Sequence, residues 1–197
     1  MAIDVDDSFL ALLEDVQVLF LHRLLGLHKK SMHAVLFTET GIMPIRYRRI
    51  ILVLRYLQYL LKLPAHHYAH AAFNDACLLH AEKKPSWVGD IVFVLSHLQI
   101  SVMLKPVHLA NPDSIMDLIA DVELSCACAL QKDINESEKT VLLKKRILTS
   151  CPLELSDVLK YWHYLDVAVP AHCKVLTQLV TSCHMLAVNS LWWDPVQ

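Results

Sequence analysis

Apolar residues recur along most of this chain at intervals of three and four, the spacing that places side chains on one face of an α-helix. In the first segment this spacing connects Phe9, Leu12, Leu13, Val16, Leu19 and Phe20. Ser8 stands just before the pattern, where a hydroxyl can accept a hydrogen bond from a free backbone N–H of the first turn. The sequence therefore predicts a first helix, capped by Ser8, that ends at about Leu25.

Turn-forming residues divide the following segment into two more helices. Ser31 is expected to cap a short helix that stops at Gly41, because glycine readily adopts the left-handed conformation that ends a helix. Pro44 is expected to open a third helix, since the first turn of a helix tolerates a residue without a backbone N–H. This third helix is predicted to run to about Leu63.

Prolines and capping residues also mark the helices of the middle segment. Pro64 is expected to start a fourth helix that continues to Pro85, and Ser86 is expected to cap a fifth helix over residues 86–98. Residues 99–110 are the one stretch in which the sequence permits extended chain.

The C-terminal part begins with a strong helix start, because Asn111 can cap and Pro112 can occupy the first turn. A long helical pattern continues from Asp117 through Arg146 towards residue 149, and the Cys-Pro pair at 151–152 interrupts it. Shorter helices are expected after this break, at Ser156–Leu165, Pro170–Val180 and Ser182–Trp193.

These elements predict an all-α protein, a packed array of about eight or nine helices without a substantial sheet. The composition agrees, because 55% of the 197 residues are hydrophobic and only three glycines and eight prolines interrupt the chain. We expect a single helical domain over residues 1–197. Within it, N-terminal helices with a basic patch occupy 1–63, middle helices occupy 64–110, and a long helix with the C-terminal helices occupies 111–197.

The high hydrophobicity raises the question of a membrane span, since the mean hydropathy is +0.38. The longest apolar runs are nevertheless broken by polar residues. Arg55 divides the run over residues 50–61, and Asp90 and His97 interrupt the run over residues 87–104. A spanning helix needs about 18 or more apolar residues with few charges, so we expect no membrane association.

The first residues carry acidic side chains where a secretory signal would carry basic ones. We therefore expect an intracellular protein, cytoplasmic or nuclear, that is not secreted. Its six cysteines show no CxxC spacing and are expected to be reduced thiols, because disulfides are rare in reducing compartments.

Charge is distributed unevenly along the chain. Residues 1–21 hold five acidic residues and no lysine or arginine, a charge of -5. Residues 22–62 hold eight lysines and arginines against one glutamate, a charge of +7, and the remaining residues bring the formal net charge to -2. A basic stretch of this kind is the electrostatic signature of contact with a nucleic-acid phosphate backbone.

The best candidates for phosphate contact are Arg46, Arg48, Arg49 and Arg55, with Lys29 and Lys30 in support. Tyr47, Tyr56 and Tyr59 interleave with the arginines and could stack on bases, although aromatic residues at helical spacing more often pack in a core. A second interpretation is a solvated helix face whose arginine stems cover apolar surface. No base-reading motif is present, so contact with nucleic acid is expected to be weak and without sequence preference.

Potential metal ligands occur in pairs at helical spacing, namely His66 with His70 and Cys77 with His80. A zinc site needs three or four protein ligands, and the two pairs lie about 10 Å apart along a helix that rises about 1.5 Å per residue. The cysteines and histidines at 172–173 and 183–184 would meet only if the last two helices formed a hairpin. We therefore expect no metal site.

Asp6 and Asp7 are adjacent, and paired aspartates hold the two metals of a polymerase. Such a site needs a further carboxylate on a preceding strand, and only five residues precede this pair. The sequence has no glycine-rich phosphate loop, no GxSxG motif and no nucleophile with an evident base. We therefore expect no catalytic residue and no cofactor, and we do not expect an enzyme.

The stretch over residues 16–64 is VQVLFLHRLLGLHKKSMHAVLFTETGIMPIRYRRIILVLRYLQYLLKLP. It resembles the region downstream of the catalytic palm and thumb in reverse transcriptases of LINE-like, non-LTR retrotransposons, in particular those abundant in mushroom-forming, basidiomycete fungi. There the pattern is a Val-Gln helix, an RRLLGL turn, a short basic loop, ELGIMPL and an arginine-rich helix that ends in Leu-Pro. The similarity continues through FNDACLLHAEKKPSWVGDI, LLKKRIL and YLDVAVPAHCKVLTQLVTSCHMLAVNSL, so it covers nearly the whole chain.

The chain also departs from this family pattern. Family members usually carry the palm, with its aromatic-x-Asp-Asp motif, before this region and a Cys/His cluster that resembles a zinc knuckle after it, and both are missing here. Residues 39–41 read ETG in place of Glu-Leu-Gly, and Cys173 and Cys183 stand where polar or basic residues are usual. The resemblance thus implies a separated C-terminal fragment to which no polymerase residue can be transferred.

Together with the basic stretch, the resemblance implies a non-catalytic helical C-terminal fragment of a retrotransposon RNA-directed DNA polymerase that supports backbone-level nucleic-acid binding. The alternative is a helical protein–protein interaction module without a nucleic-acid role. In that case the apolar excess marks a surface for self-association or for packing against a polymerase core, with the first helix and Trp192–Trp193 as the expected contacts.

Overall fold

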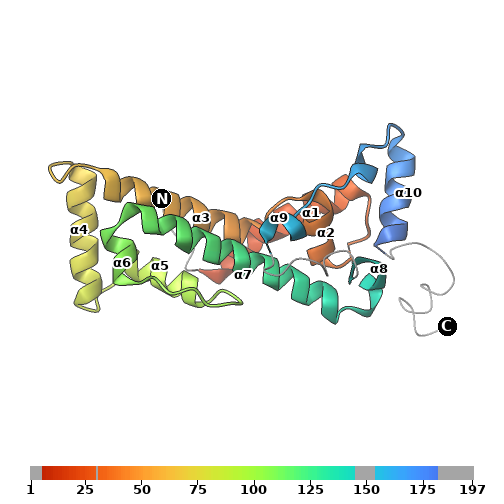
Figure 1. Ribbon diagram of the computed structural model, residues 1–197. Coiled ribbons are helices and arrows are strands. Elements are labelled where there is room, and N and C mark those ends of the chain that lie inside the picture. Colours follow the sequence, from red (N-terminus) through yellow and green to blue (C-terminus); the bar gives the residue numbers. More distant parts are fainter. Residues whose placement is uncertain (1–5, 30, 145–153, 182–197) are drawn as a thin grey trace. The chain divides into compact units, whose positions relative to one another are not determined.

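The computed structural model of the chain describes residues 6–29, 31–144 and 154–181. Within these ranges the secondary structure is helical, without strands and with one isolated antiparallel bridge between Thr40 and Tyr161 (Figure 1). The prediction of an all-α, multi-helix protein is confirmed. None of the helices in these ranges is long and apolar enough to cross a membrane.

The chain divides into two compact units. The first combines Met1–Leu13 with Ile45–Cys126, and the second combines Glu14–Pro44 with Ala127–Gln197. Each unit thus joins two stretches that are distant in the sequence, whereas the sequence suggested three consecutive segments, 1–63, 64–110 and 111–197. The expectation that residues 1–197 fold as a single domain stays a prediction.

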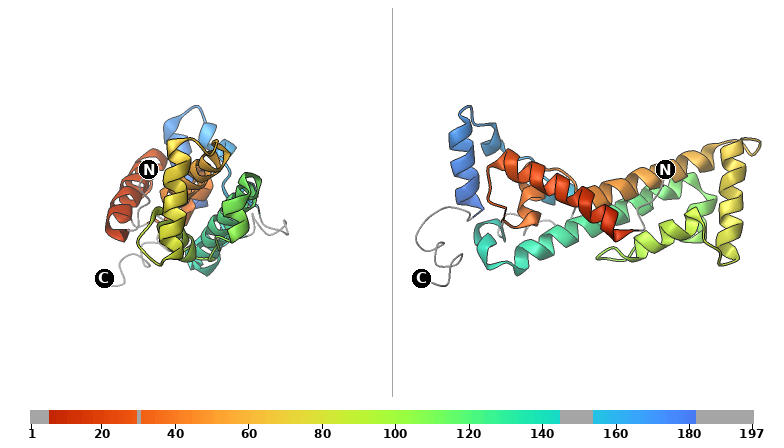
Figure 2. Two further views of the ribbon diagram at one scale, coloured as in Figure 1. Left: turned by 90° about the vertical axis from the view of Figure 1, so that its left-hand side faces the viewer. Right: turned by 180° about the vertical axis from the view of Figure 1, so that it is seen from behind.

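The first unit is built mainly from α3, α4, α5 and the first half of α7. Its elements are α3 (Ile45–Lys62), α4 (Tyr68–Ala81), α5 (Trp87–Ser96), α6 (Pro106–Ala110), η1 (Pro112–Ser114) and the parts of α1 (Asp7–Leu25) and α7 (Ile115–Glu136) that fall within it. Helix α4 lies across the end of α3 and leads into α5, as Figures 1 and 2 show from three sides.

Side-chain caps place most of the helix starts in the first unit. Ser86 Oγ accepts a hydrogen bond from the Gly89 N–H at 3.1 Å, which confirms it as the cap of α5. The prediction that α4 starts at Pro64 is wrong, because His67 caps this helix and residues 64–67 form a turn before it. Residues 99–110 form no strand, and their second half forms α6.

The second unit contains short helices around α2. Its elements are α2 (His33–Thr40), η2 (Glu138–Thr140), α8 (Val141–Lys144), α9 (Leu155–Val158), η3 (His163–Asp166), α10 (Pro170–Val180) and the remaining parts of α1 and α7. Helix α10 has the predicted bounds, whereas α9 and η3 replace the predicted helix over 156–165. The predicted helix at Ser182–Trp193 lies outside the described residues.

The long helix predicted to reach beyond Arg146 ends at Glu136 instead. The buried Thr140 hydroxyl donates hydrogen bonds to the carbonyls of Ile134 and Ser137, so the chain turns into η2 at this point.

At the other end of the chain, Ser8 does not cap α1. Asp6 takes this role, because its Oδ1 accepts from the Ser8 N–H at 2.8 Å. Likewise Met32, rather than Ser31, occupies the N-cap position of α2.

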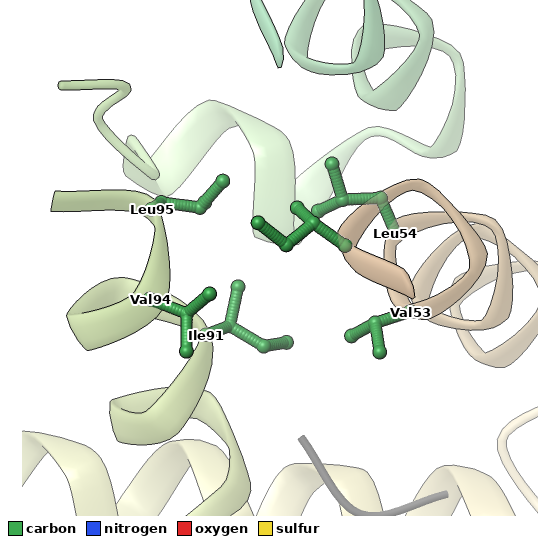
Figure 3. Close-up of a pocket in the computed structure, with 6 residues that line it drawn as sticks. Val53, Leu54, Ile91, Val94 and Leu95 are labelled. Atoms are coloured by element: carbon green, nitrogen blue, oxygen red, sulfur yellow. The ribbon is translucent and has the colours of Figure 1, made fainter. Parts of the chain in front are cut away.

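The core of the first unit forms on one side of α3. Val53 and Leu54 of α3 point toward Ile91, Val94 and Leu95 of α5 (Figure 3). Together with Ile50 these residues line an apolar pocket of about 10 Å³, close to the minimum that one water molecule needs. This packing fixes which side of α3 faces solvent.

The core of the second unit includes polar side chains. Glu39 is only 1% exposed, and its carboxylate accepts a hydrogen bond from the hydroxyl of Tyr164.

A buried histidine also belongs to this core. His22 is 6% exposed and lies edge-on to His33, with ring centroids 6.0 Å apart. Neither ring nitrogen of His22 has a hydrogen-bond partner among the described residues. Burial lowers the pKa of His22 below 6.5, and the nearby His33 and His28 lower this pKa further.

Gly41 ends α2 with a φ of 68°, and a Cβ at this position would meet the backbone nitrogen of Tyr161 at 2.9 Å. Gly41→Ala is therefore expected to lower the free energy of unfolding by about 1–3 kcal/mol, the range for strain in the left-handed region. Chemical denaturation followed by circular dichroism measures this loss. Gly89→Ala is the control, because a Cβ there lies 3.4 Å from its nearest neighbours in a helix that favours alanine. Equal stability of both variants would contradict the prediction.

The stability of the protein is expected to fall with acid because of His22. Its pKa is lower in the folded protein than in the unfolded chain, so the unfolded chain binds the proton more readily. This contribution is fully present above the unfolded pKa of about 6.5 and is lost as the pH falls below it. Denaturation curves between about pH 7.5 and 5 should show a smaller pH dependence in His22→Leu. The exposed His66→Leu should retain the wild-type pH dependence, and a His22→Leu curve parallel to wild type would refute this account.

Candidate nucleic-acid interface

The most strongly basic element of the structure is α3. Its sequence IRYRRIILVLRYLQYLLK contains four arginines and one lysine and no carboxylate. The residues that it buries are Tyr47, Ile50, Ile51, Val53, Leu54, Leu57 and Leu60. Arg46 shares this side of the helix with Ile50 and Val53, four and seven residues further on, whereas the other cations lie elsewhere on the circumference.

Three cations align on the side of α3 that faces away from its buried residues. Arg48, Arg55 and Lys62 are exposed and follow each other at intervals of seven residues, which is about two turns and about 10 Å per step. Beside them are the exposed side chains of Leu52, Tyr56 and Tyr59. We call these six residues the outer face of α3. None of the three cations has an ion pair within the described ranges.

The other two arginines of the predicted site do not belong to this face. Arg46 points elsewhere, because two residues correspond to about 200° around a helix, and its guanidinium lies 3.5 Å from Asp7 Oδ1. Arg49 is half-buried on the flank of the outer face. The predicted set of four arginines is therefore divided by the helix, and Arg48 and Arg55 are the two that face solvent freely.

Neither of the two predicted lysines belongs to α3. Lys29 is exposed and belongs to the second unit, after the end of α1. Lys30 lies outside the described residues. The candidate interface is thus the outer face of α3 alone, with Lys62 added to the predicted residues.

The tyrosines of α3 differ in their surroundings. Tyr47 is 8% exposed and belongs to the core, as aromatic residues at helical spacing usually do. Tyr56 and Tyr59 are 38% and 52% exposed, so the expectation that they lie in a core is wrong for these two. Their rings stack with centroids 6.1 Å apart and an interplanar angle of 26°. The stacked pair lies directly beside Arg55 on the helix.

Two aromatic residues of other helices support this pair, and the sequence did not single them out. Trp87 at the start of α5 meets Tyr56 edge-on, with centroids 5.9 Å apart. Phe73 of α4 meets Trp87 in the same way, at 6.5 Å. The one available signal was the Ser86 cap, which indicated that Trp87 begins a helix but not which helix it would contact.

The other candidates from the sequence have structural roles or stand apart. Asp6 caps α1 and Asp7 pairs with Arg46, so both aspartates have partners within the fold. His67 caps α4, and His70 Nδ1 lies 3.3 Å from the Leu60 carbonyl. In the part of the chain that the structure describes, no three His, Cys, Asp or Glu residues are grouped so as to hold a metal ion. Residues 183–184 lie outside that part.

A hollow of about 360 Å³ lies in the second unit. Its lining residues are Arg23, Leu24, Leu25, Gly26, Leu165, Val167, Cys173 and Lys174. They include a thiol and two cations but no carboxylate or imidazole that could serve as a base. The Cys173 thiol is 3.6 Å from the Leu165 carbonyl, to which it donates. This hollow therefore has the features of a surface depression rather than of an active site.

No protein-family model, curated protein or solved structure matches the chain. The interpretation of the outer face of α3 consequently rests on its own geometry and charge.

Proposed function

We propose that the protein binds nucleic acid weakly and without sequence preference, and that the outer face of α3 is the contact surface. The observation that carries this proposal is the row of Arg48, Arg55 and Lys62, which are exposed on a helix without a carboxylate. Steps of about 10 Å along a rod match a repeated, evenly charged ligand better than a small anion. A phosphate backbone is such a ligand.

The physical basis of this binding is the release of counterions. Each phosphate that a cation neutralises frees condensed ions into solution, so affinity falls steeply as salt increases. Contacts with phosphates position a protein but do not read bases, which agrees with the absence of a base-reading motif in the sequence. The proposed role is therefore to hold a strand, with chemistry left to other proteins.

The same proposal includes the origin of the chain. A non-catalytic helical C-terminal fragment of a non-LTR retrotransposon reverse transcriptase would lie beside the template and primer strands inside the cell, where a basic helix supports strand binding. The resemblance of residues 16–64 and the all-α fold support this origin. The test is the genomic sequence upstream of the coding region, where a palm motif with paired aspartates is expected.

The row of Arg48, Arg55 and Lys62 predicts how single substitutions change the salt dependence of nucleic-acid binding. Arg55→Gln removes one phosphate contact and is expected to reduce the slope of log K against log salt by about 0.7–0.9. Arg46→Gln removes the same charge from the same helix, but Arg46 pairs with Asp7 and should leave the slope unchanged. Fluorescence anisotropy titrations at about 50–200 mM salt measure both slopes.

Two results would contradict this proposal. Wild-type affinity that does not depend on salt would exclude phosphate contact as the source of binding. Equal changes in both variants would mean that overall charge, rather than the outer face of α3, governs the interaction.

A second candidate function is self-association, which the apolar surface of α1 supports. Within the second unit, Val16, Leu19, Phe20 and Leu24 of this helix are 67%, 49%, 57% and 59% exposed. They lie at positions i, i+3, i+4 and i+8, which share one face of a helix. The opposite face is also apolar but buried, with Leu21 at 0% exposure. A contiguous exposed face of four large apolar side chains has the character of an interface.

The occupant that we propose for this face is the same face of a second copy. An antiparallel pair of helices related by a two-fold axis would bury the four apolar side chains of each copy against those of the other. The exposed parts of the four side chains amount to roughly 400 Å² per copy, below the ~800 Å² of a stable interface, so the dimer is expected to be weak.

A charge placed on this face tests the arrangement. Phe20→Lys is expected to weaken the dimer, because it brings a charged side chain into the apolar contact. Sedimentation velocity over a dilution series measures the association. Leu78→Lys, at a 64% exposed position of α4, is the control that should leave it unchanged. A wild-type monomer at high concentration, or a Phe20→Lys variant that associates as strongly as wild type, would exclude this interface.

A further inference from the structure

Tyr59 is the most exposed aromatic residue of the basic helix. Its side chain is 52% exposed, and the ring of Tyr56 lies beside its ring with centroids 6.1 Å apart. Among the described residues, no ring other than that of Tyr56 stacks with Tyr59. An open aromatic face of this kind can accept a nucleic-acid base, since every base has a flat apolar surface.

Other aromatic side chains support the ring of Tyr59 on the side of the first unit's core. Tyr56 is braced edge-on by Trp87, and Trp87 in turn by Phe73, which is 4% exposed. The four rings form a series that leads from the core of the first unit to its surface. A side chain fixed in this way loses little conformational freedom when a ligand stacks on it, which favours binding.

The open ring stands among the cations of the proposed interface. Tyr59 follows Arg55 by four residues and precedes Lys62 by three, so all three side chains share one side of α3. A strand that runs along the helix can thus place phosphates beside Arg55 and Lys62 and a base over Tyr59. From Arg48 to Lys62 the face is about 21 Å long at a rise of about 1.5 Å per residue.

We propose that the outer face of α3 selects single-stranded nucleic acid over duplex, because Tyr59 stacks on an unpaired base. This inference rests on the proposed function, since it assigns the substrate class of the same surface. In a duplex the faces of the bases are covered by their neighbours, and only a single strand can present one to the ring.

Charge alone would give the opposite preference. A duplex carries one negative charge per ≈ 1.7 Å of its length and is neutralised with a steeper salt dependence than a single strand. A site that acted only through Arg48, Arg55 and Lys62 would therefore bind duplex at least as well. Preference for the single strand is thus diagnostic of stacking.

The experiment uses the full chain and three ligands of ten nucleotides or base pairs: a mixed-sequence single strand, the duplex, and a single strand of the same charge whose residues are all abasic. The wild type is expected to bind the normal strand about 10-fold more tightly than the abasic strand and the duplex, a factor within the range of base–aromatic stacking. Tyr59→Leu should bind the normal and abasic strands equally. Tyr59→Phe retains the ring and should keep the preference to within about 2-fold.

The outcomes separate this inference from the proposed function. Salt-dependent binding of all three ligands, with duplex bound as tightly as the single strand, would overturn the stacking assignment and leave the phosphate interface intact. A loss of binding in Tyr59→Leu that is equal for normal and abasic strands would also overturn it. No binding of any ligand at about 50 mM salt would overturn both. Circular dichroism of Tyr59→Leu confirms that the variant folds, as expected for a replacement at an exposed position.

Discussion

The burial of one side of α3 is the constraint on which the proposed interface depends. Val53 and Leu54 are buried and point toward apolar residues of α5, and the burial of this side determines the rotation of α3 about its axis (Figure 3). Once the rotation is determined, every other position on the helix has an assigned direction. Arg46 and Arg48 are two residues apart, yet one pairs with Asp7 and the other faces solvent. The charge pattern of the surface is thus a consequence of apolar packing.

Local chemistry allowed several elements to be predicted closely from the sequence. Gly41 ends α2 in the left-handed conformation, Ser86 caps α5, and Pro170 opens α10, because each of these residues acts on its own backbone or within one turn. The prediction failed where a neighbouring residue took over such a role. Asp6 caps α1 in place of Ser8, and the imidazole of His67 caps α4 three residues after the expected start at Pro64.

The sequence predicted only part of the candidate site, because the charge of a stretch does not determine the directions in which its cations point. Lys29 was therefore grouped with the arginines of α3. Helical geometry then separates Arg48 and Arg55 from Arg46, and adds Lys62 at the same interval. The aromatic support of Tyr56 by Trp87 joins residues that are 31 positions apart by number, and such tertiary contacts leave no trace in local spacing.

The composition of the two units also has a consequence for the order in which the chain folds during synthesis. The second unit needs residues on both sides of the stretch that forms most of the first, and the hydrogen bond from Tyr164 to Glu39 closes a loop of 125 residues. Since a ribosome releases the N-terminal residues first, Glu39 of α2 emerges long before its partner Tyr164. Closing so long a loop is slow compared with forming a local helix. Assembly of the second unit is therefore expected to be the late step, during which α2 depends on protection from aggregation.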